Sequence, residues 1–198
     1  LSAPFATAQA LKVISYAVVL GGALLDNARL FDQVRHLAVS DALTGLANYR
    51  RFVDMLESEI RRSQRTGRTF ALVLLDLDGL KKINDKLGHL VGTRAISRVA
   101  RTLKMQCRSI DMAARYGGDE FALVLPEAGP DAARQVADRI AQRLASDGEM
   151  PPLSASIGIA VYPHDGDTVE RLLNAADNGL YHMKGKRKRK PKLPAAAM

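Results

Sequence analysis

The spacing of apolar residues along this 198-residue chain predicts an alternation of helices and short strands. A continuous apolar run at residues 70–75 is typical of a strand that is buried on both faces of a sheet. Two shorter apolar runs flank Gly117 and Gly118, and a glycine pair in that setting predicts a β-hairpin. Helical spacing predicts helices over 49–64, 79–87, 93–105, 132–144 and 168–183, and a further strand is expected over 153–161. These elements indicate a domain that mixes helices with a sheet containing one hairpin.

Residues 1–39 show a different pattern from the rest of the chain. They contain no proline after Pro4, and Leu24, Phe31 and Ala38 lie seven residues apart with Asn27 between them. Such spacing, with a polar residue in the seam, is typical of two parallel helices that fix their register. A helix packed on a neighbouring domain outside this sequence is the alternative. We predict a long signalling or dimerisation helix over 1–39 and a boundary near residue 40, where turn and cap residues break the periodicity.

Composition and charge narrow the class of protein. The chain is 47% hydrophobic and 25% charged, as folded proteins are. Its net charge of +8 would favour nucleic acid, an anionic membrane or a phosphorylated ligand. Seven of the cations lie within residues 184–192, where no aromatic side chain offers base stacking, so nucleic acid is not expected as a partner. Residues 186–198 are predicted to form a basic C-terminal tail.

Cysteine content and hydropathy bear on localisation. The single cysteine excludes an internal disulfide, which fits a reducing cytoplasm. The uncharged stretch at 13–25 is shorter than the roughly 20 residues that a membrane-spanning helix needs. We therefore expect a cytoplasmic location and no membrane segment in this sequence. Because it begins at Leu1 rather than Met, the sequence is expected to be part of a longer protein.

Carboxylates follow directly on the buried strand predicted at 70–75. A buried carboxylate needs a cation, a metal or hydrogen-bond donors. For Asp78, capping the helix expected from residue 79 is as good an interpretation as a role in binding a cation. Asp76 precedes the cap position. The tip of the predicted hairpin adds Asp119 and Glu120, which could join Asp76 in an oxygen-rich cluster suited to Mg²⁺. The tip glycines would let a triphosphate approach the main-chain amides.

Several motifs together resemble the GGDEF family of diguanylate cyclases. The segment Arg115-Tyr-Gly-Gly-Asp-Glu-Phe121 resembles the family signature. Other family motifs occur in the same order: Asp41-Ala-Leu-Thr-Gly-Leu-Ala-Asn48, Asp76-Leu-Asp-Gly-Leu-Lys-Lys-Ile-Asn-Asp85, Gly88-His89 and Ala176-Asp-Asn-Gly-Leu-Tyr-His-Met-Lys184. The preceding helix is similar to the last helix of a GAF sensory domain.

The resemblance implies a fold and an activity for residues 40–185. The fold is of the α+β class, an α/β sandwich with a central, mostly antiparallel sheet flanked by helices, similar to the palm of polymerases and of class III nucleotide cyclases. The activity is condensation of two GTP into cyclic di-GMP with release of two pyrophosphates. Two Mg²⁺ or Mn²⁺ ions per active half-site would assist. Since one domain holds one nucleotide, a homodimer is expected.

The resemblance also assigns roles to individual residues. The catalytic residues would be Asp119, Glu120 and Asp76, and the metal ligands Asp76, Asp119, Glu120 and the main-chain carbonyl of Leu77. The substrate-binding positions would be Lys81, Asn84, Thr93, Gly117, Gly118, Lys184 and Lys188. Asn84 is expected to contact guanine, and the lysines the β- and γ-phosphates, with Lys188 standing where the family usually has arginine.

A second set of residues matches the inhibitory product site of the family. Arg108 and Asp111 have its RxxD spacing, and Arg139 is a weaker candidate for a further contact with cyclic di-GMP. The planar arginine suits guanine and phosphate acceptors, and the carboxylate suits guanine donors. A surface ion pair is the alternative interpretation.

One departure from the family pattern concerns the choice of base. Thr93 stands where the family usually has an aspartate that accepts hydrogen bonds from guanine. Threonine is neutral and can both donate and accept, so we expect a weaker preference for guanine. The alternative function is a hybrid cyclase that also uses ATP and makes cyclic AMP-GMP. A function of another class is an inactive receptor that binds cyclic di-GMP through Arg108 and Asp111.

Overall fold

The computed structural model describes residues 11–12, 14–26 and 39–189, and side chains as far as Lys184. Its contacts divide the chain into two units, Leu1–Val39 and Ser40–Met198. In the first unit, residues 11–12 and 14–26 are helical, and apolar side chains such as Leu11, Ile14 and Leu24 are exposed. The predicted seam at 27–38 and the tail from 190 lie outside the described residues. Within the described residues, no helix has both the length and the apolar character that crossing a membrane requires.

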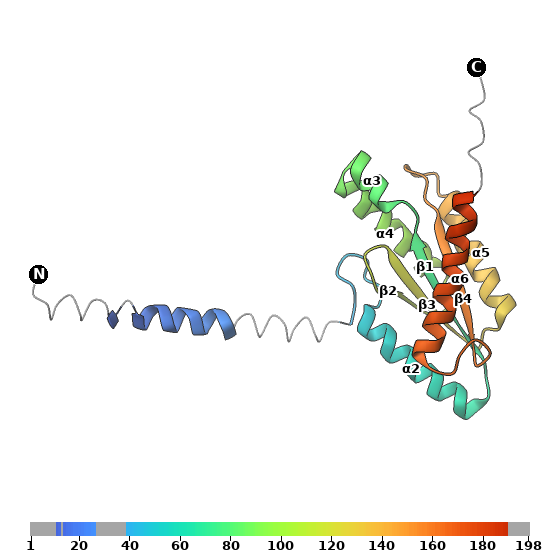
Figure 1. The fold of residues 1–198 in the computed structure, drawn as a ribbon, viewed down its shortest axis with the longest axis horizontal. Coiled ribbons are helices and arrows are strands. Elements are labelled where there is room, and N and C mark those ends of the chain that lie inside the picture. The colour runs from blue at the N-terminus through green and yellow to red at the C-terminus, as the bar shows by residue number, and fades with distance from the viewer. Residues whose placement is uncertain (1–10, 13, 27–38, 190–198) are drawn as a thin grey trace, which may run out of the picture. The chain divides into compact units, whose positions relative to one another are not determined.

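A four-stranded antiparallel sheet forms the centre of the second unit (Figure 1). Its strands are β1 (Phe70–Leu77), β2 (Met112–Arg115), β3 (Glu120–Pro126) and β4 (Ala155–Tyr162), in the spatial order β2-β3-β1-β4. The apolar run predicted as a buried strand is β1, which is paired on both sides. The glycine pair connects β2 to β3, as expected. The predicted α+β fold with an antiparallel sheet is therefore confirmed.

Five helices cover the two faces of this sheet (Figure 1). They are α2 (Tyr49–Thr66), α3 (Leu80–Leu87), α4 (His89–Gln106), α5 (Pro130–Ala145) and α6 (Val169–Arg189). Asn48 starts α2 by accepting a hydrogen bond from the main chain, and Gly67 ends it in the left-handed conformation. Residues of α2 and α6 pack in one apolar cluster, and residues of α4 and α5 in the other. The result is a sheet between two helical layers.

The alternation of side chains along β1 determines on which face of the sheet Asp76 lies. Leu75 and Leu77 join the cluster that contains α4 and α5, whereas Leu72 and Leu74 join the one that contains α6. Because the side-chain period of a strand is two, Asp76 emerges on the α6 side. There α6 lies directly over β4: a Cβ added to Gly158 would stand 1.9 Å from the carbonyl oxygen of Ala176. This close approach brings the end of α6 to the end of β1.

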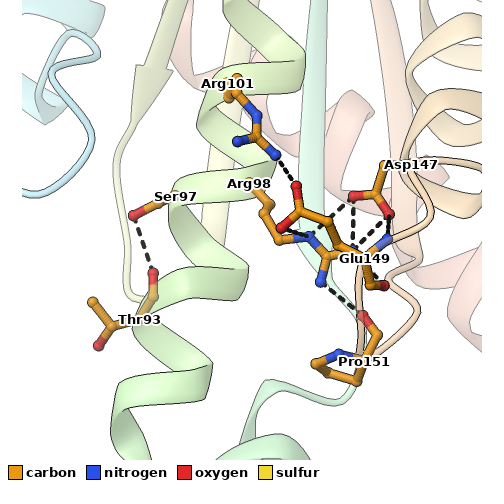
Figure 2. A network of polar contacts seen from close by, with 7 residues as sticks. All are labelled: Thr93, Ser97, Arg98, Arg101, Asp147, Glu149 and Pro151. Atoms are coloured by element: carbon orange, nitrogen blue, oxygen red, sulfur yellow. Dashed lines mark hydrogen bonds and ion pairs between the residues drawn. The ribbon is translucent and has the colours of Figure 1, made fainter.

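A buried arginine attaches α4 to the segment that leads into β4 (Figure 2). The Arg98 side chain is 5% exposed. Its guanidinium donates to both Asp147 carboxylate oxygens, at 2.7 Å from Nη2, and to the carbonyls of Glu149 and Pro151. These contacts lower the pKa of Asp147 against the opposing effect of its burial. We call this set of contacts the Arg98 clamp.

The element boundaries and one predicted helix cap differ in places from the sequence expectations. The helix predicted from residue 93 begins at His89, because a single residue with positive φ, Gly88 at 86°, separates it from α3. Asp78 does not cap α3: the cap position is Gly79, and no side chain bonds to the start of that helix. The last helix continues to Arg189, so the boundary expected at 185 falls within it.

Candidate active site

Three of the predicted acidic residues lie together at one end of the sheet. Asp76 is the cross-strand neighbour of Glu120 on one side and of Ser156 on the other. The Leu77 N–H donates to the Asp119 carbonyl at 2.9 Å. The hairpin therefore pairs beside β1 as expected and brings its tip carboxylates next to Asp76.

The carboxylates of this cluster are short of compensating charge. Burial raises the pKa of Asp76, and the charges of Asp119 and Asp78 raise it further. Burial also raises the pKa of Glu120, with Asp119 and Asp76 adding to the effect. Lys184 on α6 donates to Asp76 Oδ2 at 2.7 Å. Burial alone would lower the pKa of Lys184, but this hydrogen bond outweighs it and raises that pKa. One ammonium thus faces several carboxylates.

The donor set fits a divalent cation, although it is not assembled into a finished metal centre. Among the described residues, no group of three or more His, Cys, Asp or Glu side chains stands ready to hold an ion. Lys184 engages one oxygen of Asp76. Carboxylates and a main-chain carbonyl are nevertheless the hard oxygen ligands that Mg²⁺ takes, and Mg²⁺ commonly completes its coordination with substrate phosphates.

Two adjoining clefts open beside these carboxylates. The first, about 520 Å³, is lined by Asp76, Leu77, Asp78, Gly79, Leu80, Lys81, Asp119, Ser154, Ser156 and Lys184. The second, about 490 Å³, is lined by Leu80, Lys81, Asn84, Asp85, His89, Ile96, Arg115, Gly118 and Asp119. Leu80, Lys81 and Asp119 belong to both linings. Both clefts carry charged groups; the first adds serine hydroxyls, and the second adds amide, imidazole and apolar groups.

Asn84 and Thr93 are neighbours through Gly92. A Cβ on Gly92 would lie 1.8 Å from Asn84 Oδ1, so the amide rests directly on the glycine. Thr93 follows on α4, is exposed, and donates its hydroxyl hydrogen to the His89 carbonyl at 2.9 Å. Asn84 and His89 line the second cleft, and Thr93 lies next to that lining rather than in it. Sequence reasoning gave His89 no role, although Gly88-His89 belongs to a family motif.

The two tip glycines differ in their surroundings. A Cβ on Gly117 would lie 2.1 Å from Glu120 Oε2, whereas a Cβ on Gly118 would meet nothing within 4 Å. Gly117 therefore makes room for the Glu120 carboxylate. Gly118 leaves an open approach to the main chain.

Arg115 ties the hairpin tip to the turn that opens the domain. Its Nη2 donates to the Gly118 carbonyl at 2.8 Å, and its Nη1 donates to both Asp41 carboxylate oxygens at 3.2 Å. Burial alone would raise the pKa of Asp41, but hydrogen bonds from Thr44 and Arg115 together lower it. Sequence reasoning placed Asp41 and Arg115 in separate motifs and did not pair them, because nothing local links positions so far apart.

Arg108 and Asp111 lie together on the turn after α4. The Arg108 N–H donates to Asp111 Oδ2 at 2.8 Å. Both line a cleft of about 390 Å³ with Lys104 and Cys107. Burial raises the pKa of the Cys107 thiol to about 12, so it is not a reactive thiol at neutral pH. The guanidinium of Arg108 remains available to a ligand.

The other two predicted positions lie elsewhere. Arg139 donates to Gln106 Oε1 at 3.2 Å and lines a separate depression of about 260 Å³ with Gln142, Arg143 and Ser146. The backbone of Lys188 belongs to α6, and its side chain lies outside the described residues.

Comparison with known proteins identifies the family. The family described as "Diguanylate cyclase, GGDEF domain" matches residues 38–190. The chain belongs to this GGDEF family. The bifunctional diguanylate cyclase/cyclic di-GMP phosphodiesterase MucR of Pseudomonas aeruginosa is 38% identical over 161 residues, which cover 79% of this chain and 24% of MucR. The chain thus spans about a quarter of that relative.

Solved GGDEF structures share the fold. A sensory box/GGDEF family protein from Caulobacter crescentus aligns with a TM-score of 0.70 and 37% identity, over 75% of this chain and 99% of that one. The GGDEF domain of DgcB from Caulobacter crescentus, in complex with c-di-GMP, aligns with a TM-score of 0.70 and 28% identity, over 75% and 89%. The resemblance drawn from the motifs is therefore confirmed at the level of family and fold.

Proposed function

We propose that this GGDEF domain is a Mg²⁺-dependent diguanylate cyclase that condenses two GTP into cyclic di-GMP as a homodimer. The observation that carries the proposal is the group of under-compensated carboxylates, Asp76 and Glu120 with raised pKa values, beside a cleft that ends at Asn84. Such groups mark sites that await a cation or a proton. Because the substrate is GTP, the domain would work in the cytoplasm.

The two clefts would bind different parts of the nucleotide. Lys81 and Lys184 would hold the β- and γ-phosphates in the first, for which Lys184 must leave Asp76. Asn84 would orient the base in the second. Asp76, Asp119, Glu120 and the Leu77 carbonyl would hold two Mg²⁺ ions, which supply charge stabilisation at the phosphates and a lower pKa for the attacking hydroxyl. Gly118 would let the triphosphate approach the main chain.

Glu120 is suited to the proton transfer. Its carboxylate belongs to the residue that pairs with Asp76 at the end of β1, and a positioned carboxylate can accept a proton from a hydroxyl. It would take the proton of the 3′-hydroxyl as that oxygen forms a bond to the α-phosphorus of the other nucleotide. The bond between the α-phosphorus and the bridging oxygen breaks, and pyrophosphate leaves with the electron pair. Two such steps close the ring, so a second domain must face the first.

The test is pyrophosphate release and product analysis with GTP and Mg²⁺ over a range of protein concentrations. We expect cyclic di-GMP and a specific rate that rises with concentration, because each domain supplies one nucleotide. The exposed apolar side chains of the helix at 14–26 offer a surface on which two chains could pair. No pyrophosphate at any concentration, together with binding of cyclic di-GMP in equilibrium dialysis, would instead favour the receptor.

Thr93 favours a second candidate, a hybrid cyclase that also accepts ATP. Its hydroxyl hydrogen already bonds to the His89 carbonyl, so it presents only lone pairs of a neutral oxygen to a base. With equal GTP and ATP, we expect cyclic AMP-GMP beside cyclic di-GMP. Thr93→Asp should shift the product ratio towards cyclic di-GMP by roughly tenfold or more, and Thr93→Ser should not. A wild type that makes only cyclic di-GMP from the mixture rejects this candidate.

Product inhibition is proposed to act through Arg108, with Asp111 as its partner and Arg139 as a further contact. Arg108→Ala should abolish inhibition by added cyclic di-GMP while leaving the initial rate unchanged. Arg134→Ala, an exposed arginine on α5, is the matched control. Inhibition that survives in Arg108→Ala would mean that the product competes at the substrate cleft.

A further inference from the structure

A fourth carboxylate, Asp78, lies at the same end of β1 and is bound by two serines. Ser156 Oγ donates to its Oδ1 at 2.7 Å, and Ser154 Oγ donates to its Oδ2 at 2.8 Å. The Asp78 N–H donates in turn to the Ser154 carbonyl at 2.9 Å. Both oxygens and the main chain of Asp78 are therefore attached to the beginning of β4.

These contacts fix the turn that follows β1. Leu77 is 1% exposed and is held by the Asp119 carbonyl, while Gly79 turns the chain with φ of 74°. Since α3 starts without a side-chain cap, the serine contacts of Asp78 attach the turn to the sheet. The peptide between Leu77 and Asp78, which carries the carbonyl that the proposed function assigns to the metal, is thereby held in place.

The serines themselves are fixed. Ser156 is fully buried in the row formed with Asp76 and Glu120, where a hydroxyl requires a partner. The segment before Ser154 is held to α4 by the Arg98 clamp, through Asp147 and the Pro151 carbonyl (Figure 2). Ser154 and Ser156 are therefore held in place by contacts that do not involve Asp78.

We propose that Asp78 is a positioning residue: Ser154 and Ser156 withdraw its carboxylate from the set of metal ligands and, through it, hold the Leu77 carbonyl in place. This inference rests on the proposed function, because it concerns the same metal site. Each oxygen of the Asp78 carboxylate already accepts a serine hydroxyl hydrogen bond, so rotating the side chain to ligate an ion would cost these contacts. The acidic set at the metal is therefore Asp76, Asp119 and Glu120, without Asp78.

The test measures Mn²⁺ affinity by the paramagnetic resonance signal of free Mn²⁺, with 3′-deoxy-GTP bound so that no reaction occurs. Asp78→Ala and the double variant Ser154→Ala/Ser156→Ala should each weaken Mn²⁺ binding about tenfold, as loss of supporting hydrogen bonds at metal sites does. Asp78→Asn should stay within about threefold of wild type, because an amide can keep both serine contacts. Ser154→Ala alone is the milder variant if the double variant does not fold.

The controls separate positioning from simple stability. Ser63→Ala removes a hydroxyl that is also buried, at 3% exposure on α2, and should leave Mn²⁺ binding unchanged. Asp78→Asn binding Mn²⁺ as poorly as Asp78→Ala would show that the charge of Asp78 acts directly, which overturns the inference. Serine variants that bind Mn²⁺ like wild type overturn it as well. A wild-type protein without nucleotide-dependent Mn²⁺ binding would overturn the proposed function instead.

Discussion

The Arg98 clamp and the acidic end of β1 are two charged regions of one domain with opposite electrostatic character. In the clamp, one buried guanidinium meets the Asp147 carboxylate, two carbonyls and, at 3.5 Å, the Glu149 carboxylate, and the pKa of Asp147 is lowered. At the end of β1, several carboxylates share Lys184, and the pKa values of Asp76 and Glu120 are raised. Compensated charge stabilises the fold, whereas uncompensated charge is tolerated where a cation or a proton is to be bound.

Glu120→Gln, at the acidic end of β1, should have the largest effect, which is a loss of activity. The amide keeps the shape of the side chain but cannot accept the proton or supply a charged ligand. We expect the rate of pyrophosphate release to fall by about 100- to 1000-fold. Thermal unfolding should occur at the same or a higher temperature, because a repelling charge is removed. A large loss of stability would show that the carboxylate is structural.

Asp147→Ala, in the Arg98 clamp, should lower the free energy of unfolding. It leaves the buried Arg98 guanidinium with only the half-exposed Glu149 carboxylate at 3.5 Å, and removal of one partner from a buried ion pair costs about 3–5 kcal/mol. Urea unfolding measures the loss. In the double variant Arg98→Met/Asp147→Ala, part of the stability should return, since no charge is then left buried. If the single variant unfolded like wild type, the clamp would not be a stabilising contact.

These two regions could be anticipated from sequence to different degrees. The run at 70–75 marks a central strand because burial on both faces requires continuous apolar residues, and the glycine pair marks the hairpin that brings Glu120 beside it. Nothing local indicates that Arg98 binds Asp147, because the partner belongs to a loop 49 positions away. The same holds for Asp78: a helix cap is the local solution, and two serines far along the chain displace it.

The dependence of stability on pH should sharpen the contrast. The stabilisation from Asp147, with its lowered pKa, is present above the ordinary aspartate pKa and is lost as pH falls through the lowered value. For Glu120, with its raised pKa, ionisation in the folded state is unfavourable, so stability declines as pH rises through the raised value. Urea unfolding from pH 3 to pH 7 should show Asp147→Ala approaching wild type towards acid, and any gain from Glu120→Gln growing towards neutral pH.

Glu149→Ala should have the smallest effect. The Glu149 side chain is 48% exposed; it pairs with the exposed Arg101 and lies 3.5 Å from Arg98 Nε, while its carbonyl, which the substitution keeps, accepts from Arg98 Nη2. An exposed ion pair contributes about 0–1 kcal/mol. Urea unfolding should therefore show a change within that range, and 0.5 M NaCl should reduce it further. A loss of stability as large as that of Asp147→Ala would show that the Glu149 side chain contributes as much to the clamp as Asp147 does.

The length of α4 separates the cleft at Asn84 and His89 from the proposed product site at Arg108 within one domain. The helix has 18 residues, or about 27 Å at 1.5 Å per residue, with His89 at its first position and the turn of Arg108 just past its last. A cyclic dinucleotide held by Arg108 is too short to occupy the cleft of the same domain. Under the proposed function, the product would therefore inhibit at a distance, by restraining how two domains can meet, and its potency should depend on the linkage between chains rather than on the concentration of GTP.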